Sequence, residues 1–484
     1  MIKHLNNNKT IILICLVVLS VLFHVITLKN DHSWGDDFSA YLSQAEAIAQ
    51  NNIDQLEDAS NFRVRLSEIQ VGPNLYPWGY PLIITFFIYF FGINIVLLKV
   101  VNLVFFIGSL VICYFLFKKF LSKNSILAIL LLLSLSPYFF SFKQEILSDI
   151  PSMFFLLMSL LLIQNYIGQT KPKNPTLFFL GATIFASVFI RTSAFIIIPT
   201  LLLTQLINYK QSLASGRKII ISSIPYFTFL AFFAVSGLIF PASSYSENHT
   251  LLAPNLSLLI INVQYYSKLL IEFFGHPDSV FSQFLYFGSI PFFVFGVIAN
   301  YRKNYVYLIY GALTLIMFLA YPYQQGLRFI ISLIPLYMFF VVAGIQTLKF
   351  DGISSTVHNV LKPIALILIV VFFLKSNINS LQSPTDGPYT PNAVQLFEHI
   401  KNNTQEDATI SFFKPRAMYL YTERNSLRID SKTALSKSKI DYVVFTKQMN
   451  DQKLGKFLDQ NYAKVFSNET FYLYDLKKDN SLIN

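Results

Sequence analysis

The sequence predicts a polytopic α-helical membrane protein with a small extramembrane α/β domain at its C-terminal end. Three observations support this fold class. The 484 residues are 54% hydrophobic and only 13% charged, whereas a soluble globular chain carries about 25% charged residues. Apolar runs that approach the roughly 20 residues needed to cross a bilayer as a helix recur from the N-terminal end to about residue 375. Beyond that point the composition becomes polar.

We predict about eleven transmembrane helices from these runs. Their ranges are 11–28, 94–117, 125–142, 147–167, 176–190, 192–208, 219–240, 284–300, 305–322, 329–348 and 361–374. The stretch "NLYPWGYPLIITFFIYFFG" (74–92) contains an apolar segment of only about a dozen residues, which is too short to cross. We expect an interfacial or re-entrant helix there. A second amphipathic segment, near 255–274, is suited to lie flat on the membrane.

The basic residues predict the orientation of these helices. Lysine and arginine concentrate in cytoplasmic loops, and a cytoplasmic N-terminus places nearly all of the loop lysines and arginines on one side. The acidic loop 30–79, the loop 241–283 and the C-terminal tail then lie outside. We therefore expect a multi-pass protein of the plasma membrane, or the inner membrane of a bacterium. The net charge of +11 is explained by the cytoplasmic loops and requires no nucleic-acid partner.

The tail predicts a domain of its own, with a boundary near residue 376. It opens with the breaker-rich linker "SPTDGPYTP" and continues with alternating helix and strand patterns. We expect helices at 392–403, 415–421 and 450–460, strands at "TISFF" and "DYVVFT", and a closing pair at "AKVF" and "FYLYDL". The predicted organisation is a transmembrane domain, 1–375, followed by an extracytoplasmic α/β domain, 376–484.

Two adjacent carboxylates, Asp36 and Asp37 in "WGDDFSAYL", stand at the start of the acidic loop. The apolar spacing that follows predicts a helix, so an aspartate at its first turn is favoured by the helix dipole and can cap its free amides. This interpretation accounts for one carboxylate but not for two that repel each other. A functional role for the pair is the alternative.

Other ionisable side chains also fall in short external connections. "KQEILSDIPSMFF" contains Lys143, Glu145 and Asp149, although Asp149 is also placed to cap the helix that follows. Arg191 in "FIRTSAF" and Arg328 in "YQQGLRFIISLIP" run against the positive-inside rule. These two arginines either extend to lipid headgroups or bind a phosphate, which matches the guanidinium fork.

The aromatic residues of the segment 74–92 have two interpretations of equal weight. Tyr76, Trp78 and Tyr80 are typical of an aromatic belt that anchors a protein at the membrane interface. Contact with a substrate is the alternative, and Tyr80 and Tyr41 are the residues that we single out for it.

Five motifs in order, "DDFSAY", "YPWGYPL", "EILSDIPSMFF", "RTSAFIIIP" and "QGLRFIISLIPL", resemble the GT-C superfamily of membrane glycosyltransferases. The nearest members are the family 39 relatives, which are the protein O-mannosyltransferases and the lipid A aminoarabinose transferases. The resemblance covers about residues 10–350. It implies a polyprenyl-phosphate-linked sugar as donor, an acceptor on the external face and a catalytic aspartate in the first external loop.

The family pattern leaves the choice between the two aspartates open. It has Asp-Glu with an aromatic residue four positions after the aspartate, and this sequence has Asp-Asp. The spacing back from Tyr41 selects Asp37, which we favour, and the adjacent-acid pattern selects Asp36. The acceptor that this implies is a hydroxyl of a lipid, a glycan or a protein.

The residues themselves support the same chemistry. Sugar transfer requires a base for the acceptor hydroxyl and positive charge on the departing phosphate. Asp37 beside Asp36 supplies the base, and Lys143, Arg191 and Arg328 hold the phosphate. Glu145 and Asp149 are candidate ligands for a divalent cation.

Two other classes of protein fit the same sequence. A multi-spanning transporter or flippase would use these charges along a translocation path. An envelope polysaccharide polymerase or ligase would also use a lipid-linked sugar. We expect the charged residues, which come from distant segments, to meet at the external face.

Overall fold

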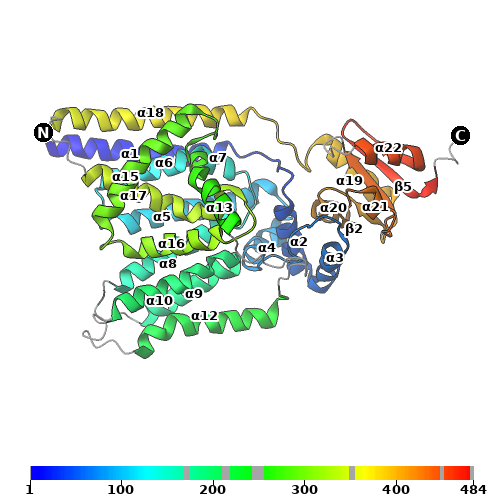
Figure 1. The fold of residues 1–484 in the computed structure, drawn as a ribbon, viewed down its shortest axis with the longest axis horizontal. Coiled ribbons are helices and arrows are strands. Elements are labelled where there is room, and N and C mark those ends of the chain that lie inside the picture. The colour runs from blue at the N-terminus through cyan, green and yellow to red at the C-terminus, as the bar shows by residue number, and fades with distance from the viewer. Residues whose placement is uncertain are drawn as a thin grey trace. The chain divides into compact units, whose positions relative to one another are not determined.

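The computed structural model describes residues 2–167, 169, 174–209, 219–242, 256–347, 355–446 and 452–479 (Figure 1). The predicted cytoplasmic connections at 170–173, 210–218 and 348–354 lie outside these residues, as does the 243–255 part of the predicted external loop 241–283. The chain divides into two compact units. One comprises residues 1–28, 99–238 and 251–383, and the other comprises residues 29–98, 239–250 and 384–484.

The first unit is helical. In chain order its elements are α1 (Ile2–Ile26), most of α5 (Ile95–Phe117), α6 (Lys123–Leu135), α7 (Pro137–Phe142), α8 (Asp149–Ile167), α9 (Asn174–Ile190), η1 (Thr192–Ile196), α10 (Ile197–Ile207), α12 (Ile219–Ile239), α13 (Leu256–Leu269), α14 (Ile271–Phe274), α15 (Val280–Asn300), α16 (Tyr305–Leu319), η2 (Gly326–Leu333), α17 (Ile334–Thr347) and α18 (Ser355–Leu381). Figure 1 shows most of the long helices running side by side.

Six helical segments of the described residues are long and apolar enough to cross a membrane. They are Ile95–Phe117, Asp149–Ile167, Ile221–Ile239, Val280–Asn300, Gly326–Thr347 and Leu361–Leu381. Shorter apolar helices occupy the remaining predicted spans, so each predicted range coincides with helix. The predicted helical membrane fold is confirmed at this level. The predicted short segment is also found, as the 13-residue helix α4 (Gly79–Phe91).

Close packing between α15 and α17 depends on two glycines that face each other. A Cβ on Gly296 would lie 1.9 Å from the carbonyl oxygen of Phe340, and a Cβ on Gly344 would lie 1.9 Å from that of Phe292. Small residues let helix backbones approach in this way, which gains van der Waals contact where lipid removes the hydrophobic driving force. The apolar core of the unit continues through buried residues of α5, α6, α8 and α17.

The connection that leads to α8 is fixed by its sequence. The predicted span 125–142 breaks at Ser136, whose backbone is extended, because Pro137 begins α7 and disfavours helical geometry in the residue before it. After α7, the Nδ2 atom of Asn102 on α5 donates hydrogen bonds to the carbonyl oxygens of Glu145 and Leu147, at 3.1 and 3.2 Å. This connection therefore holds Asp149, the first residue of α8, in a defined place.

The second unit combines the segment 29–98, which includes the predicted first external loop, with residues 239–250 and the tail. Its helices are α2 (Asp36–Gln50), α3 (Ile53–Leu66), α4, α19 (Pro391–Asn403), α20 (Pro415–Thr422), α21 (Lys432–Leu435) and α22 (Gln452–Asn461), and its strands are β1 (Thr409–Ser411), β2 (Asn425–Leu427), β3 (Tyr442–Thr446), β4 (Tyr462–Ser467) and β5 (Phe471–Asp479). The strand order is β2-β1-β3-β5-β4. Strand β1 is parallel to β2 and β3, and β5 is antiparallel to β3 and β4.

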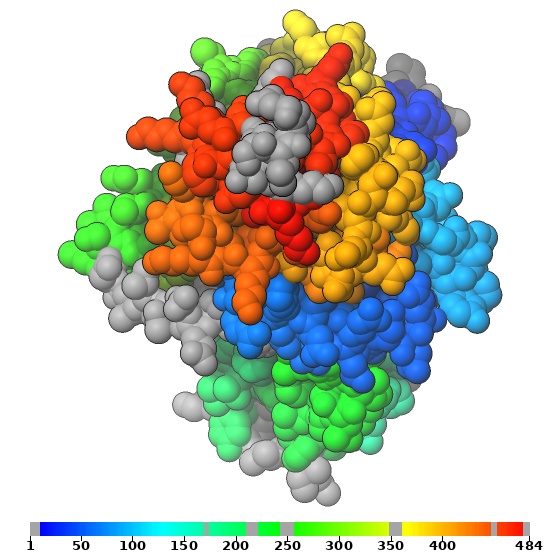
Figure 2. Space-filling model, turned by 90° about the vertical axis from the view of Figure 1, so that its right-hand side faces the viewer, coloured from blue at the N-terminus to red at the C-terminus, as the bar shows by residue number. Residues whose placement is uncertain are grey.

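The first loop packs closely on the tail. Helix α2 contacts α20, and α3 contacts β2. In Figure 2 the blue surface of the first loop adjoins the orange and red surface of the tail. The indole of Trp34 packs against a buried cluster that contains Phe397, Phe412 and Phe471. The small C-terminal sheet domain that the sequence predicts is present, and its core includes this side chain from the first loop. Independent folding of 376–484 stays a prediction.

Candidate functional site

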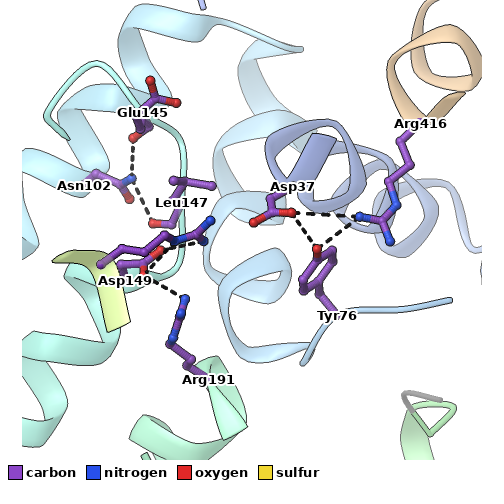
Figure 3. A network of polar contacts seen from close by, with 9 residues as sticks. Asp37, Tyr76, Asn102, Glu145, Leu147, Asp149, Arg191 and Arg416 are labelled. Atoms are coloured by element: carbon purple, nitrogen blue, oxygen red, sulfur yellow. Dashed lines mark hydrogen bonds and ion pairs between the residues drawn. The ribbon is translucent and has the colours of Figure 1, made fainter. Parts of the chain in front are cut away.

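The first candidate site is an ionic cluster around Asp149 in the helical unit. Its carboxylate is fully buried and accepts contacts from two guanidinium groups. Arg191 Nη1 lies 2.8 Å from Oδ1, and Arg328 donates from Nη2 to Oδ2 at 3.0 Å and from Nε to Oδ1 at 3.3 Å. Figure 3 shows the Asp149 and Arg191 side chains directed toward each other. The predicted arginine pair is therefore brought together, with Asp149 between its members.

Local backbone structure explains how three distant segments supply this cluster. Asp149 occupies the first turn of α8, where the dipole favours a carboxylate. Arg191 follows the last residue of α9 in extended conformation, so the chain turns there before η1 begins. Arg328 lies in η2, where non-helical geometry at Ile330 kinks the segment that enters α17.

The cluster lines a cavity in the helical unit. Both arginine side chains are about one-fifth exposed, at 17% and 19%, so each guanidinium remains partly accessible. Other polar lining side chains are Ser152, Ser193, Tyr310, Thr314 and Ser332. The Ser152 hydroxyl is buried without a hydrogen-bond partner among the described residues. Asp149, Arg191 and Arg328 together carry a formal charge of +1, and Glu272 is a further acid beside η2. The two partly exposed guanidinium groups are the donors that an anionic ligand would meet in this cavity.

The predicted metal ligands do not form a suitable donor set. Both Asp149 oxygens are already bound by guanidinium groups, and the Glu145 carboxylate points away from Asp149 in Figure 3. Among the residues that the structure describes, no three His, Cys, Asp or Glu side chains gather as a metal site. These residues therefore do not fit a divalent cation as they are arranged here.

Lys143 makes its contacts with α1 and with an aromatic ring. Its amine donates hydrogen bonds to the Thr27 hydroxyl and to the carbonyl oxygen of His24, the latter at 3.4 Å. The same amine lies 3.5 Å from the centre of the Phe140 ring. The side chain is buried, and its predicted contact with a phosphate stays a prediction.

The second candidate site is in the other unit and centres on Asp37. The Tyr76 hydroxyl donates a hydrogen bond of 2.6 Å to Asp37 Oδ1, and Arg416 Nη1 donates one of 3.1 Å to the Tyr76 oxygen. The same Nη1 lies 4.0 Å from Asp37 Oδ1. Figure 3 shows these three side chains directed toward one another. Asp37 is 24% exposed and Arg416 only 3%, so the carboxylate is accessible whereas its neighbouring cation is buried.

Burial and nearby charges keep Tyr76 and Arg416, the two neighbours of Asp37, in their protonated forms. Burial raises the pKa of Tyr76 well above its usual value, against the opposing effect of Arg416, so the phenol remains a proton donor. Burial alone would lower the pKa of Arg416, but Tyr76 and the two aspartates together raise it. The guanidinium is therefore charged at every physiological pH.

Asp36 has a different environment from Asp37. Its Oδ1 is buried and has no partner among the described residues, and the same holds for Nε and Nη2 of Arg63. Burial raises the pKa of Asp36, and Arg416, Lys414 and Arg63 partly offset that rise. Burial likewise lowers the pKa of Arg63 to about 10. Of the two candidate bases, Asp37 is thus the one whose carboxylate is held by a hydrogen bond from Tyr76.

The aromatic candidates also lie at this second site. The Tyr41 ring stacks at a tilt on Tyr76, with centroids 4.9 Å apart, and meets Tyr80 edge-on at 5.0 Å. Both Tyr41 and Tyr80 are buried. Their arrangement supports Tyr76, and their contact with a substrate stays a prediction.

Three residues of the second site were not singled out by sequence reasoning. Tyr76 was grouped with the aromatic belt, and Arg416 lay within a predicted helix of the tail, 415–421, without a role of its own. Gln44 carried no signal, yet its amide group donates to the Tyr76 carbonyl and accepts from the Tyr76 N–H, both at 2.9 Å. In the sequence, Arg416 is distinguished only by its position after Pro415, which predicts the start of a short helix.

The fold of this chain is similar to that of solved structures of two other proteins. One similar structure is ArnT from Cupriavidus metallidurans bound to undecaprenyl phosphate, with 9% identity, a TM-score of 0.62, and coverage of 95% of this chain and 97% of that chain. Another is the oligosaccharyltransferase AglB from Archaeoglobus fulgidus in complex with an inhibitory peptide and a dolichol-phosphate, with 10% identity, a TM-score of 0.57, and coverage of 95% and 74%. No family model and no curated protein match the chain.

Proposed function

We propose that this protein is a glycosyltransferase that moves a sugar from a polyprenyl-phosphate donor to a hydroxyl group of a lipid, a glycan or a protein. The observation that carries the proposal is the arginine pair around Asp149, which lines a cavity and presents two partly exposed guanidinium groups there. The GT-C fold supports it, as do the undecaprenyl phosphate of the similar ArnT structure and the dolichol-phosphate of the similar AglB structure.

The arginine cluster is the proposed site of the donor phosphate. A phosphodiester carries one negative charge, which balances the cluster. Guanidinium groups bind phosphate oxygens through parallel N–H donors, and the Ser152 hydroxyl offers a further donor. As the sugar leaves, the phosphate gains charge, and fixed donors stabilise that charge without reorganising. Asp149 holds the two arginines side by side.

Asp37 is the proposed general base. In the step that we propose, an acceptor O–H loses its proton to Asp37, the acceptor oxygen bonds to the anomeric carbon, and the bond from that carbon to the phosphate breaks. The polyprenyl phosphate is the leaving group. The hydrogen bond from Tyr76 and the nearby Arg416 support this assignment over Asp36, whose Oδ1 has no partner among the described residues, and a positioned base contributes about 10²–10⁴-fold in rate.

We propose the topology that the loop charges predict. About eleven helices cross a plasma membrane, or a bacterial inner membrane, with the N-terminus in the cytoplasm. The acidic loop and the C-terminal domain then lie on the extracytoplasmic side, where nucleotide sugars are absent and a lipid-linked donor is required. Reporter fusions after Lys119 and Arg302 should indicate the cytoplasm, and one after Ser383 should indicate the exterior.

Mass spectrometry of cells with and without the gene tests the function. Loss of the protein should leave a polyprenyl-phosphate sugar unconsumed and should remove one sugar from an envelope lipid, glycan or protein. A flippase would change the sidedness of the donor without forming a glycosidic bond in purified proteoliposomes. A polymerase or ligase would consume a polyprenyl-diphosphate glycan. Either result would overturn the proposal.

A further inference from the structure

The C-terminal domain contributes a side chain to the environment of Asp37. Arg416 follows Pro415 at the start of α20, and it is buried. One of its terminal nitrogens, Nη2, donates to the carbonyl oxygen of Pro73 at 2.5 Å, and the other, Nη1, donates to the Tyr76 hydroxyl at 3.1 Å. A guanidinium group can make these two bonds at once because its donors are fixed in a planar fork.

The backbone around this guanidinium is shaped to admit it. Gly72 has a φ of +83°, which disfavours any residue with a side chain, and a Cβ there would lie 2.9 Å from Arg416 Nη2. The Arg416 side chain also lies over the Tyr76 ring, with 4.9 Å from Cζ to the centroid. The first loop and α20 are therefore fitted to each other at this point.

Tyr76 is held on its other side as well. Its backbone forms the paired hydrogen bonds with Gln44 of α2, the helix that also carries Asp37. The phenol therefore has little freedom to leave Asp37 while Arg416 remains in place. A chain of contacts runs from Pro73 through Arg416 and Tyr76 to the Asp37 carboxylate.

We propose that Arg416 and Tyr76 are positioning residues that orient the Asp37 carboxylate for proton transfer, so that the C-terminal domain completes the catalytic site. This inference rests on the proposed function, because it assumes that Asp37 is the base. A misplaced reacting group costs rate steeply even when binding is intact. Loss of either positioning residue should therefore lower kcat and leave donor affinity unchanged.

The pH dependence of the rate provides a second readout. The charged and titratable groups placed around Asp37 are Asp36 of α2, Tyr76 of the first loop and Arg416 of α20, and Arg63 and Lys414 act on the neighbouring Asp36. A hydrogen bond to a carboxylate and a nearby cation both favour its charged form. Without the hydrogen bond from Tyr76 or the charge of Arg416, the acidic limb of the pH–rate profile should move to higher pH.

The test uses the full-length protein in proteoliposomes with the donor identified for the wild type. Tyr76→Phe removes one oxygen atom, and Arg416→Lys keeps the charge but loses the fork. We expect kcat to fall at least about tenfold in each, which corresponds to about one lost hydrogen bond. We also expect an unchanged KM for the donor and a shifted acidic limb. Gly72→Ala should reproduce the effect of Arg416→Lys.

Matched controls come from the same unit. Tyr389→Phe removes a tyrosine hydroxyl that bonds to Tyr421, and Arg428→Lys alters an arginine that pairs with Asp430. Both should keep wild-type kcat and an unmoved pH profile. If Tyr76→Phe and Arg416→Lys behave like these controls while the wild type transfers sugar, the inference is wrong. If the wild type itself transfers no sugar, the proposed function fails instead.

Discussion

Replacement of Asp149 by asparagine should lower the stability of the protein and increase the stabilisation that a phosphate ligand provides. Asparagine keeps the size of the side chain and removes its charge. Arg191 and Arg328 would then face each other in a partly buried cavity without a counter-charge. The formal charge of the cluster changes from +1 to +2.

The expected magnitudes follow from burial. Removing one partner of a buried ion pair costs about 3–5 kcal/mol. Because asparagine retains one acceptor oxygen, we expect a loss near the lower value, about 3 kcal/mol. At an unfolding entropy of about 2.1 cal/mol/K per residue, a chain of 484 residues shifts by about 1 °C per kcal/mol, so this loss lowers Tm by about 3 °C. A phosphate at about 5 Å from the additional charge gains up to roughly 3 kcal/mol at an effective dielectric constant of 20.

The assay is thermal unfolding in detergent with and without undecaprenyl phosphate. The Asp149→Asn variant should unfold at lower temperature than the wild type, and the lipid should raise its Tm by more than it raises that of the wild type. Asp278→Asn is the control, because Asp278 is highly exposed beside His276, and both of its values should match the wild type. If Asp149→Asn is as stable as the wild type, or the lipid stabilises it less, the phosphate assignment is refuted.

Two further predictions concern the same sites. Arg328→Ala should weaken undecaprenyl phosphate binding by about tenfold to a hundredfold, because a charge-assisted contact is lost. The control variant Arg302→Ala should bind the lipid normally. Equal affinity of the two variants would show that Arg328 does not belong to the phosphate site. Burial raises the pKa of Asp36, so the stability that this group contributes is present at low pH and is lost as the pH rises through its folded-state value. The Tm of Asp36→Asn should therefore rise relative to that of the wild type as the pH increases above about 4, the ordinary value of an aspartate. A relative fall would show that Arg63 and Arg416 need the Asp36 charge.

The sequence predicted the local structure well where one short segment decides it. The apolar spacing after Asp37 predicted the helix that is α2, and the limited length of the apolar run after Pro81 predicted the short helix α4. The helices and strands that were predicted for the tail occur in the predicted order. Strand β2 and helix α21 were missed, because three and four residues are too few to show a periodic pattern.

The sites were predictable only in part, because they depend on contacts between distant segments. Arg191 and Arg328 stood out by opposing the positive-inside rule, and the structure brings them together on Asp149. Arg416 did not stand out, because its partners Pro73 and Tyr76 lie more than 300 positions earlier in the chain and no local pattern encodes that pairing. Asp149 does begin a helix, as one of its two interpretations expected, and it also forms ion pairs with both arginines, which no local pattern encodes.

Asp37 provides the most direct test of the central claim, which is sugar transfer from a polyprenyl monophosphate. Purified protein in proteoliposomes would be given polyprenyl-phosphate pentoses and hexoses together with envelope extract, and release of free polyprenyl phosphate would be measured. We predict release by the wild type and a loss of at least about a hundredfold in Asp37→Asn, with undecaprenyl phosphate binding unchanged. Release at the wild-type rate by Asp37→Asn, or activity only with polyprenyl-diphosphate glycans, would contradict the account.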